Sequence, residues 1–233
     1  MASEENRAAR PSAPRIFLIH ATPLAIAAIN DSFRKLWPEA GLANLLDDSL
    51  SPDLQRAGKI DRSLTDRFLK LAAYARDAGA DGIIFTCSAF GPAINACKEA
   101  LPIPVLRPNE AMVGEALAHG DRLALMATFE PALAPITDEI HLYAASLGRH
   151  VTVDRIHVPG ALEAAQKGDQ ARHNDLIARA AGGVQDADVI CFAQFSMSQS
   201  AADMCAAISG KPVLTTPDSA VRRMRQLLAD SGE

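Results

Sequence analysis

The chain has 233 residues, a mass of 24.7 kDa, 48% hydrophobic residues and 22% charged residues, a composition that excludes disorder as its main state. Aromatic residues make up only 5% of the chain, which favours helices packed on aliphatic sheets over a β-sandwich or a base-stacking platform. The formal net charge of −5 argues against a nucleic acid or an anionic membrane as a partner.

Strands and helices are expected to alternate along the first half of the chain. Residues 1–14 are polar and lack an apolar signal segment, so we expect a disordered tail there. Short apolar runs predict strands over residues 15–20, 42–46, 82–86 and 104–106. Helical spacing of apolar residues, with Pro or Gly boundaries, predicts helices over residues 23–37, 63–79, 88–100 and 110–119. The polar residues 47–61 contain Pro and Gly and are expected to form a loop.

The same order of elements returns in the second half. Strands are predicted over residues 122–127, 151–157, 189–193 and 213–214. Helices are predicted after Thr128, over residues 174–181, from about residue 196, and over residues 219–230. Alternation of this kind indicates parallel sheets with helices on both faces.

Matching positions in the two halves recur at a nearly constant separation, which indicates an internal duplication. The recurring pairs are Thr22 and Thr128 (106 residues apart), Ala80 and Ala187 (107), Pro104 and Pro212 (108), and Pro108 and Pro217 (109). The sequence therefore predicts an α/β fold of two pseudo-symmetric, flavodoxin-like lobes, each with a mostly parallel four-stranded sheet, and an active-site cleft between them. The expected units are lobe 1 (residues 15–108), lobe 2 (109–217) and a C-terminal helix (218–233) that returns to lobe 1.

The four cysteines are scattered and form no Cys-x-x-Cys pair. They indicate reduced thiols of a cytoplasmic protein, with neither a disulfide framework nor a metal site. Cys97, Cys191 and Cys205 fall at helical or strand positions where we expect them in the core. No apolar run approaches the roughly 18 residues of a membrane span.

Residues at the carboxyl ends of the strands should face the cleft, because ligands of open α/β sheets bind there. These candidates are His20, Thr22, Thr86, Cys87, Ser88, Thr128, Gln194, Phe195 and Ser196. Cys87 stands at a strand-to-helix turn, where the helix dipole favours a thiolate. The hydroxyls of Thr86 and Ser88 beside it suit an anion. A buried structural cysteine is the alternative interpretation of Cys87.

With Cys87 at the end of the third strand, the segment from Phe85 to Gly91 in a duplicated chain resembles the aspartate/glutamate/hydantoin racemase superfamily. The likeness covers residues 15–228. It implies an enzyme without metal or organic cofactor, in which two facing cysteines move a proton at the carbon α to a carboxylate or carbonyl. It also implies a homodimer or higher homo-oligomer and a small carboxylate-bearing substrate. Thr22, Ser88 and Thr128 would bind the carboxylate; otherwise they are simple helix caps.

The chain departs from this resemblance at the second cysteine. The separation of 107 residues places Gln194 opposite Cys87, and an amide neither gives nor takes a proton at neutral pH. Gln194 is instead suited to orient a carboxylate or carbonyl oxygen by hydrogen bonding. His20, with an ordinary pKa near 6.5, is the candidate for a second base, although a hydrogen-bonded strand-end histidine is an equally simple interpretation.

A racemase or isomerase of a small acid, such as an amino acid or hydantoin, is the first expectation. A single-cysteine decarboxylase of a malonate-type acid and a maleate-type cis–trans isomerase are the alternatives that need one thiol. A binding protein for small anions, without catalysis, is the alternative from a different functional class.

Overall fold

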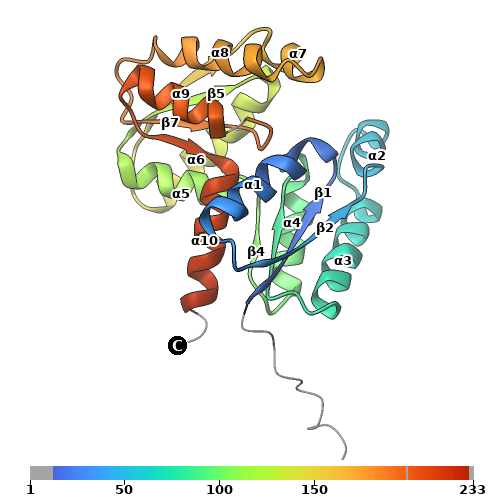
Figure 1. The fold of residues 1–233 in the computed structure, drawn as a ribbon. Helices are drawn as coiled ribbons and strands as arrows, with labels where there is room; N and C mark the ends of the chain where they lie inside the picture. Colours follow the sequence, from blue (N-terminus) through green and yellow to red (C-terminus); the bar gives the residue numbers. More distant parts are fainter. Residues whose placement is uncertain (1–12, 198, 231–233) are drawn as a thin grey trace, which may run out of the picture.

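The computed structural model describes residues 13–197 and 199–230, and it contains two four-stranded sheets, both entirely parallel. The sheet of lobe 1 has the order β2-β1-β3-β4, and that of lobe 2 has the order β6-β5-β7-β8. The predicted two-lobed α/β fold is thus confirmed (Figure 1). The strands are β1 (Arg15–His20), β2 (Gly41–Leu46), β3 (Gly82–Phe85), β4 (Val105–Leu106), β5 (Arg122–Ala127), β6 (Thr152–His157), β7 (Val189–Phe192) and β8 (Val213–Thr215).

Helices follow almost every strand, as parallel connections require. They are α1 (Ile26–Leu36), α2 (Leu50–Ala57), α3 (Arg62–Asp77), α4 (Gly91–Ala100), α5 (Glu110–His119), α6 (Leu133–Ser146), α7 (Ala161–Gln166), α8 (Gln170–Ala181), α9 (Gln199–Ser209) and α10 (Thr216–Asp230). Three short 3-10 turns, η1 (Pro23–Ala25), η2 (Ser88–Phe90) and η3 (Glu130–Ala132), stand directly after strand ends. No helix among the described residues is both long and apolar enough to span a bilayer.

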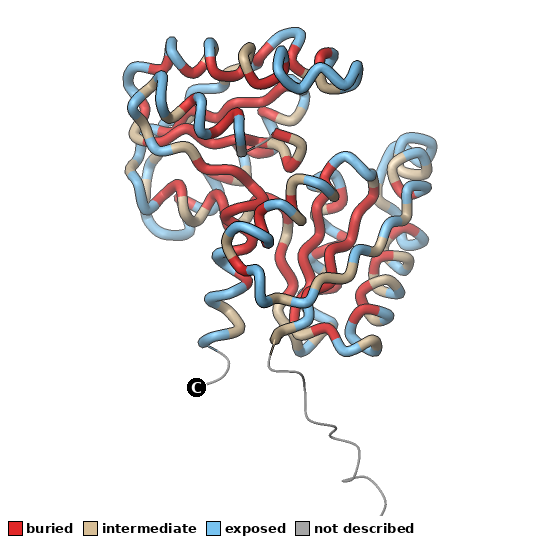
Figure 2. Tube along the Cα trace, in the orientation of Figure 1, coloured by how far each residue is buried: buried red, intermediate tan, exposed pale blue. Residues whose placement is uncertain are grey.

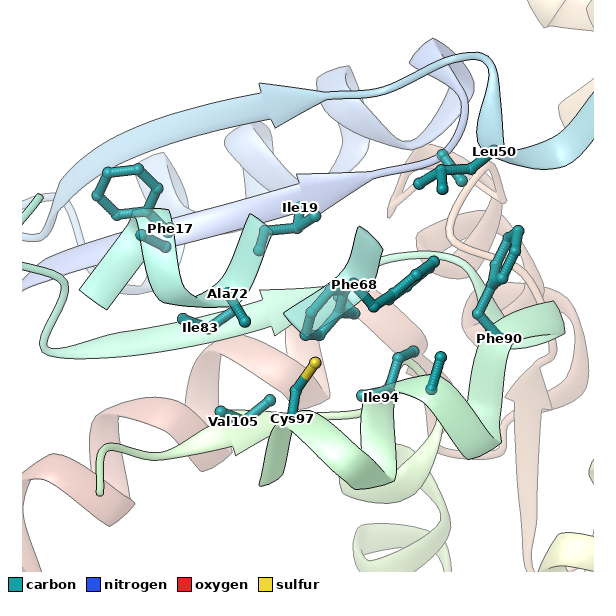
Figure 3. Packing of buried hydrophobic residues seen from close by; sticks show 14 of the residues in the cluster. Phe17, Ile19, Leu50, Phe68, Ala72, Ile83, Phe90, Ile94, Cys97 and Val105 are labelled. Atoms are coloured by element: carbon teal, nitrogen blue, oxygen red, sulfur yellow. The ribbon is translucent and has the colours of Figure 1, made fainter. Parts of the chain in front are cut away.

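The central strands of both sheets are buried on both faces, as Figure 2 shows by their colour. Five consecutive residues of β1 and five of β5 are buried, which explains why these strands are continuous apolar runs. In lobe 1 the side chains of β1 and β3 pack against α3 and α4 (Figure 3). The ring of Phe68 lies 5.4 Å from that of Phe85 and 4.7 Å from that of Phe90, between centroids. This aromatic cluster fixes the β3–α4 junction.

The two sheets repeat the same register. Ile19 pairs with Phe85 where β1 and β3 end, and Met126 pairs with Phe192 at the equivalent point of β5 and β7. Both residues of the second pair lie 107 positions after their counterparts. The strand ends of the two lobes therefore present equivalent positions, as a duplicated chain should.

Helix α10 follows the last strand of lobe 2 but packs on lobe 1, beside α1 (Figure 1). Its Val221 and Met224 join the buried cluster that contains Ile16 of β1. A Cβ at Gly82 would lie 2.5 Å from the Met224 sulfur, so a larger residue at this position of β3 would force the Met224 side chain to shift. The chain thus crosses between the lobes twice.

Two segments differ from the sequence prediction. Residues 47–61, predicted as a loop, contain α2, because Pro52 sits in its first turn, where no backbone N–H is required, and Gly58 ends it with a φ of 69°. Helix α10 starts three residues earlier than predicted, again with a proline, Pro217, in its first turn. Of the predicted tail, residues 1–12 lie outside the described residues, as do residues 231–233 of the predicted last helix.

Candidate active site

A cleft of about 370 Å³ lies between the lobes, at the carboxyl ends of both sheets. Its lining comes from the β1–α1, β3–α4 and β4–α5 junctions of the first half and from the β5–α6 and β7–α9 junctions of the second. Seven of the nine predicted site residues line it. They are Thr22, Thr86, Cys87, Ser88, Gln194, Phe195 and Ser196. Thr128 and His20 are not among the lining residues, and each is placed by a hydrogen bond to one that is.

Cys87 is the half-buried cysteine of the cleft, and it caps η2 directly after β3. Burial raises the pKa of its thiol, and the backbone N–H of Ala89 opposes this shift in part. The expected stabilisation of a thiolate is therefore wrong, and the resting group is S–H. The physical reason is that burial of the sulfur outweighs the hydrogen bond from the Ala89 N–H, the one stabilising contact at the start of the three-residue η2.

The other three cysteines lie in the core, each with 0% exposure. Burial raises the pKa of Cys97 to about 11 and those of Cys191 and Cys205 to about 12. These thiols are inert at neutral pH. Cys87 is thus the one cysteine whose sulfur a ligand in the cleft can reach.

Gln194 is held by lobe 2 in a single orientation. Its Oε1 accepts hydrogen bonds from the backbone N–H of Thr128 at 2.7 Å, the hydroxyl of Thr128 at 3.0 Å and the backbone N–H of Phe129 at 3.1 Å. The side-chain oxygen of Gln194 thus accepts the hydrogen bonds of the groups that follow strand β5. One of these groups is the Thr128 hydroxyl, to which the resemblance assigns the binding of a substrate carboxylate. Because Oε1 is fixed in this way, the Nε2 amide group is left as the donor that Gln194 can offer to a ligand.

His20 is buried behind the cleft, in a chain of hydrogen bonds that leads from Thr86 to the exposed Asn44. Its Nε2 lies 3.0 Å from Oδ1 of Asn44, whose Nδ2 donates in turn to Asn30 at 3.3 Å. Since Oδ1 only accepts, Nε2 carries the proton, and Nδ1 accepts from the Thr86 hydroxyl at 2.8 Å. Burial lowers the pKa of His20, although the hydrogen bond to Asn44 opposes this, so the ring is neutral.

This placement does not favour His20 as a base acting on substrate. The residue is 0% exposed, and both ring nitrogens have partners. It shares a closed void with Cys87, too small for a water molecule, instead of lining the cleft. His20 instead orients the hydroxyl of Thr86, the residue next to Cys87.

The remaining predicted residues differ in their exposure. The hydroxyl of Thr22 caps η1 and accepts a long hydrogen bond of 3.4 Å from the Leu24 N–H. Ser88 is exposed and is the first residue of η2. Phe195 is buried in the cluster beneath α1 and α10, and Ser196 is half-buried. Thr22, Ser88 and Ser196 are therefore the hydroxyl-bearing residues of the lining that are not buried, and the buried Phe195 adds an apolar residue to it.

The structure adds two polar lining residues that the sequence did not single out. Asn109 directly follows Pro108 after β4, and Glu139 projects from the middle of α6. Glu139 forms an ion pair with Arg107. Asn109 could have been predicted, because it follows the carboxyl end of β4. Glu139 could not, because nothing in the local sequence marks a residue in the middle of a helix as part of a cleft. Among the described residues no group of three or more His, Cys, Asp or Glu side chains has the geometry of a metal site.

Comparison with known protein families shows to which family the chain belongs. The Asp/Glu/Hydantoin racemase profile matches residues 7–224, nearly the whole chain. The chain belongs to this family. No curated protein sequence gives a significant match.

Solved structures of two racemases and of a decarboxylase share the two-lobed fold. Allantoin racemase from Klebsiella pneumoniae superposes with a TM-score of 0.68 at 20% identity, over 94% of this chain and 89% of that one. Unliganded arylmalonate decarboxylase gives 0.62 at 19% identity, over 92% of each chain. Glutamate racemase from Bacillus anthracis gives 0.68 at 13% identity, over 94% and 83%. The comparisons thus establish the fold, and the reaction of this protein has to be inferred from the residues of its own cleft.

Proposed function

We propose that this member of the racemase family catalyses a cofactor-independent reaction at the carbon α to a carboxylate of a small acid, with the Cys87 thiol as proton donor. The observation that carries the proposal is a neutral thiol in the cleft, opposite an amide instead of a second thiol. Cys87 and Glu139 are the two ionisable side chains among the residues that line the cleft. Glu139 is already paired with Arg107.

A neutral thiol suits a reaction that produces a carbanion without a base. In a malonate-type acid, one carboxylate leaves as CO₂ and the electrons of the broken C–C bond form an enediolate. Cys87 then gives its proton to the α-carbon, and the resulting thiolate regains a proton from water. We assign to the hydroxyls of Thr22 and Ser88 and to the Nε2 donor of Gln194 the role of holding the oxygens on which negative charge develops, because all three residues line the same cleft as Cys87. Decarboxylation of a malonate-type acid is therefore the form of the reaction we favour.

Racemisation or isomerisation by proton transfer is the second candidate, because one observation supports it. It needs a group that removes a proton from one face and a group that returns one to the other. Gln194 cannot take either part. The carboxylate of Glu139 is the remaining group in the cleft with that ability, and it would act as the base with Cys87 as the acid.

Cis–trans isomerisation and simple anion binding are less well supported by the cleft. A maleate-type cis–trans isomerase requires thiolate addition to a double bond, and the raised pKa of Cys87 opposes this. A binding protein for small anions would use the same hydroxyls without turnover, and the absence of turnover together with tight binding would identify it.

The test is to incubate the protein in D₂O with arylmalonates, alkylmalonates, amino acids, hydantoins and maleate, and to follow each by NMR. We expect a malonate-type acid to lose CO₂ and to give a product with one deuteron on its α-carbon. Cys87→Ala should abolish this activity, while Cys97→Ala, which removes a thiol from the same lobe outside the cleft, should retain it. Activity that survives Cys87→Ala would reject the thiol as proton donor.

We further propose a homo-oligomer, tested by light scattering coupled to size-exclusion chromatography. Two equivalents of chain mass, near twice 24.7 kDa, are expected for a dimer.

A further inference from the structure

We propose that Asn109 is a specificity-determining residue, which donates a hydrogen bond to a neutral carbonyl oxygen on the substituent of the substrate. This inference rests on the proposed function, because it assigns the part of the same substrate that lies away from Cys87.

The first observation is that the amide of Asn109 is buried without a partner. The residue is 2% exposed, and its Nδ2 makes no hydrogen bond. Asn109 is the N-cap of α5, yet its side chain does not cap the helix. A buried donor without an acceptor costs free energy. Because Nδ2 is itself buried, the Asn109 side chain would rotate toward the cleft to donate to a ligand oxygen, and it would then make a bond that the empty protein lacks.

The second observation is the position of this amide at a junction of two cavities. A cavity of about 590 Å³ between α5 and α6 adjoins the cleft of about 370 Å³ and shares part of its lining. The residues common to both linings are Ser88, Pro108, Asn109, Pro135 and Glu139. A substrate whose α-carbon lies at Cys87 would extend its substituent past this junction, with Asn109 in contact.

The third observation is the charge at the junction. Arg107 is engaged by two carboxylates, that of Glu139 and, at 3.7 Å, that of Glu110. Glu110 also pairs with Lys98 at 2.7 Å, so the cations and anions of this group balance. No free cation of the group remains for a second carboxylate of the ligand. The donor left over is the uncharged amide of Asn109, and it suits a neutral carbonyl oxygen.

The test uses pairs of acids that differ in one oxygen and are nearly equal in size. The probes are 4-oxopentanoate with 4-methylpentanoate, and 5-oxohexanoate with 5-methylhexanoate, whose binding is measured by calorimetry. For at least one pair, the wild type should bind the ketone about fivefold to tenfold more tightly than the hydrocarbon, as one net hydrogen bond predicts. Asn109→Leu and the isosteric Asn109→Asp should both abolish this preference.

Thermal unfolding supplies the second readout. Because Nδ2 has no partner in the empty protein, Asn109→Leu should unfold at or above the wild-type midpoint. Asn174→Leu is the matched control, since Asn174 is also buried but accepts a hydrogen bond from Gln170 at 2.9 Å, and it should unfold at a lower temperature.

Several results would overturn the assignment. These are equal affinity for ketone and hydrocarbon in both pairs, no detectable binding of either ketone, a preference that persists in both Asn109 variants, or an Asn109→Leu protein that is strongly destabilised. Since the probes need no turnover, failure of the proposed reaction with an intact ketone preference would reject only the reaction. Loss of the preference with an intact reaction would reject only the role of Asn109.

Discussion

Gln194 performs two tasks that two substitutions can separate. Its Oε1 accepts three hydrogen bonds from Thr128 and Phe129, while its Nε2 is the donor assigned to the substrate. Gln194→Ala removes both. Each net hydrogen bond is worth ~0.5–1.5 kcal/mol, and Gln194 is only half-buried, so water replaces part of the loss. We expect Gln194→Ala to lower the free energy of unfolding by about 1–2 kcal/mol.

Gln194→Glu keeps an oxygen for the three donors but replaces the amide N–H donor by a second carboxylate oxygen. This variant should be as stable as the wild type, because hydrogen bonds to a charged acceptor are at least as strong as those to a neutral one. It should nevertheless lose ~100-fold or more in kcat/KM, as removal of a donor to a developing oxyanion predicts. Urea unfolding and steady-state kinetics of the two variants provide the comparison. A Gln194→Glu protein that is as unstable as Gln194→Ala, or one that is fully active, would refute the division of tasks.

The remaining predictions concern the titration of two side chains and the contact between the lobes. The kcat/KM of the enzyme should fall as the pH approaches the raised pKa of the Cys87 thiol, because this thiol must be protonated to act, and alkylation of Cys87 should accelerate over the same range. A profile that rises with pH would contradict this. The folded-state pKa of His20 lies below its ordinary value of 6.5, so the unfolded chain binds a proton first, and the stability of the wild type should decrease as pH falls below 6.5. His20→Asn should show a weaker decrease in urea titrations at several pH values, and an equal decrease would argue against the neutral, buried histidine. Gly82→Ala should lower the free energy of unfolding by about 1–2 kcal/mol, since the added Cβ meets the Met224 sulfur, and the double variant with Met224→Ala should show a non-additive effect; strict additivity would reject the close contact.

The fold was predictable because its signals are local and repeated. Continuous apolar runs specify strands covered on both faces, and a separation near 107 residues relates the two lobes. The segments that differ are those in which the prediction places a proline outside the helix, in a loop for Pro52 and before the helix for Pro217. Pro52 and Pro217 stand in first turns, and the sequence alone does not distinguish a proline that starts a helix from one that ends the preceding segment.

The candidate site was predictable to the extent that it follows from one rule, that residues after the carboxyl ends of parallel strands line the ligand cleft. That rule, applied to a duplicated chain, found Cys87 and placed Gln194 opposite it. It could not predict that Oε1 of Gln194 binds the backbone beyond β5, because this contact joins residues 66 positions apart in sequence. The protonation of Cys87 also depends on three-dimensional burial, which outweighs the effect of a short 3-10 turn.

The ion pair beside the cleft could not be predicted from local sequence patterns. Glu139 reaches the cleft from the middle of α6, in a helix whose sequence does not mark that position, and its partner Arg107 lies in the other half of the chain. Such a pair becomes visible only once α6 is packed beside the β4–α5 junction.

The most direct test of the central claim is the fate of the proton delivered to the α-carbon. With the active substrate in D₂O, mass spectrometry and NMR of the product should show one deuteron at that carbon, on a single face, for the wild type and for Cys97→Ala. Cys87→Ala should form no such product. Equal rates of deuterated product from Cys87→Ala and Cys97→Ala would contradict the assignment of Cys87 as the proton donor.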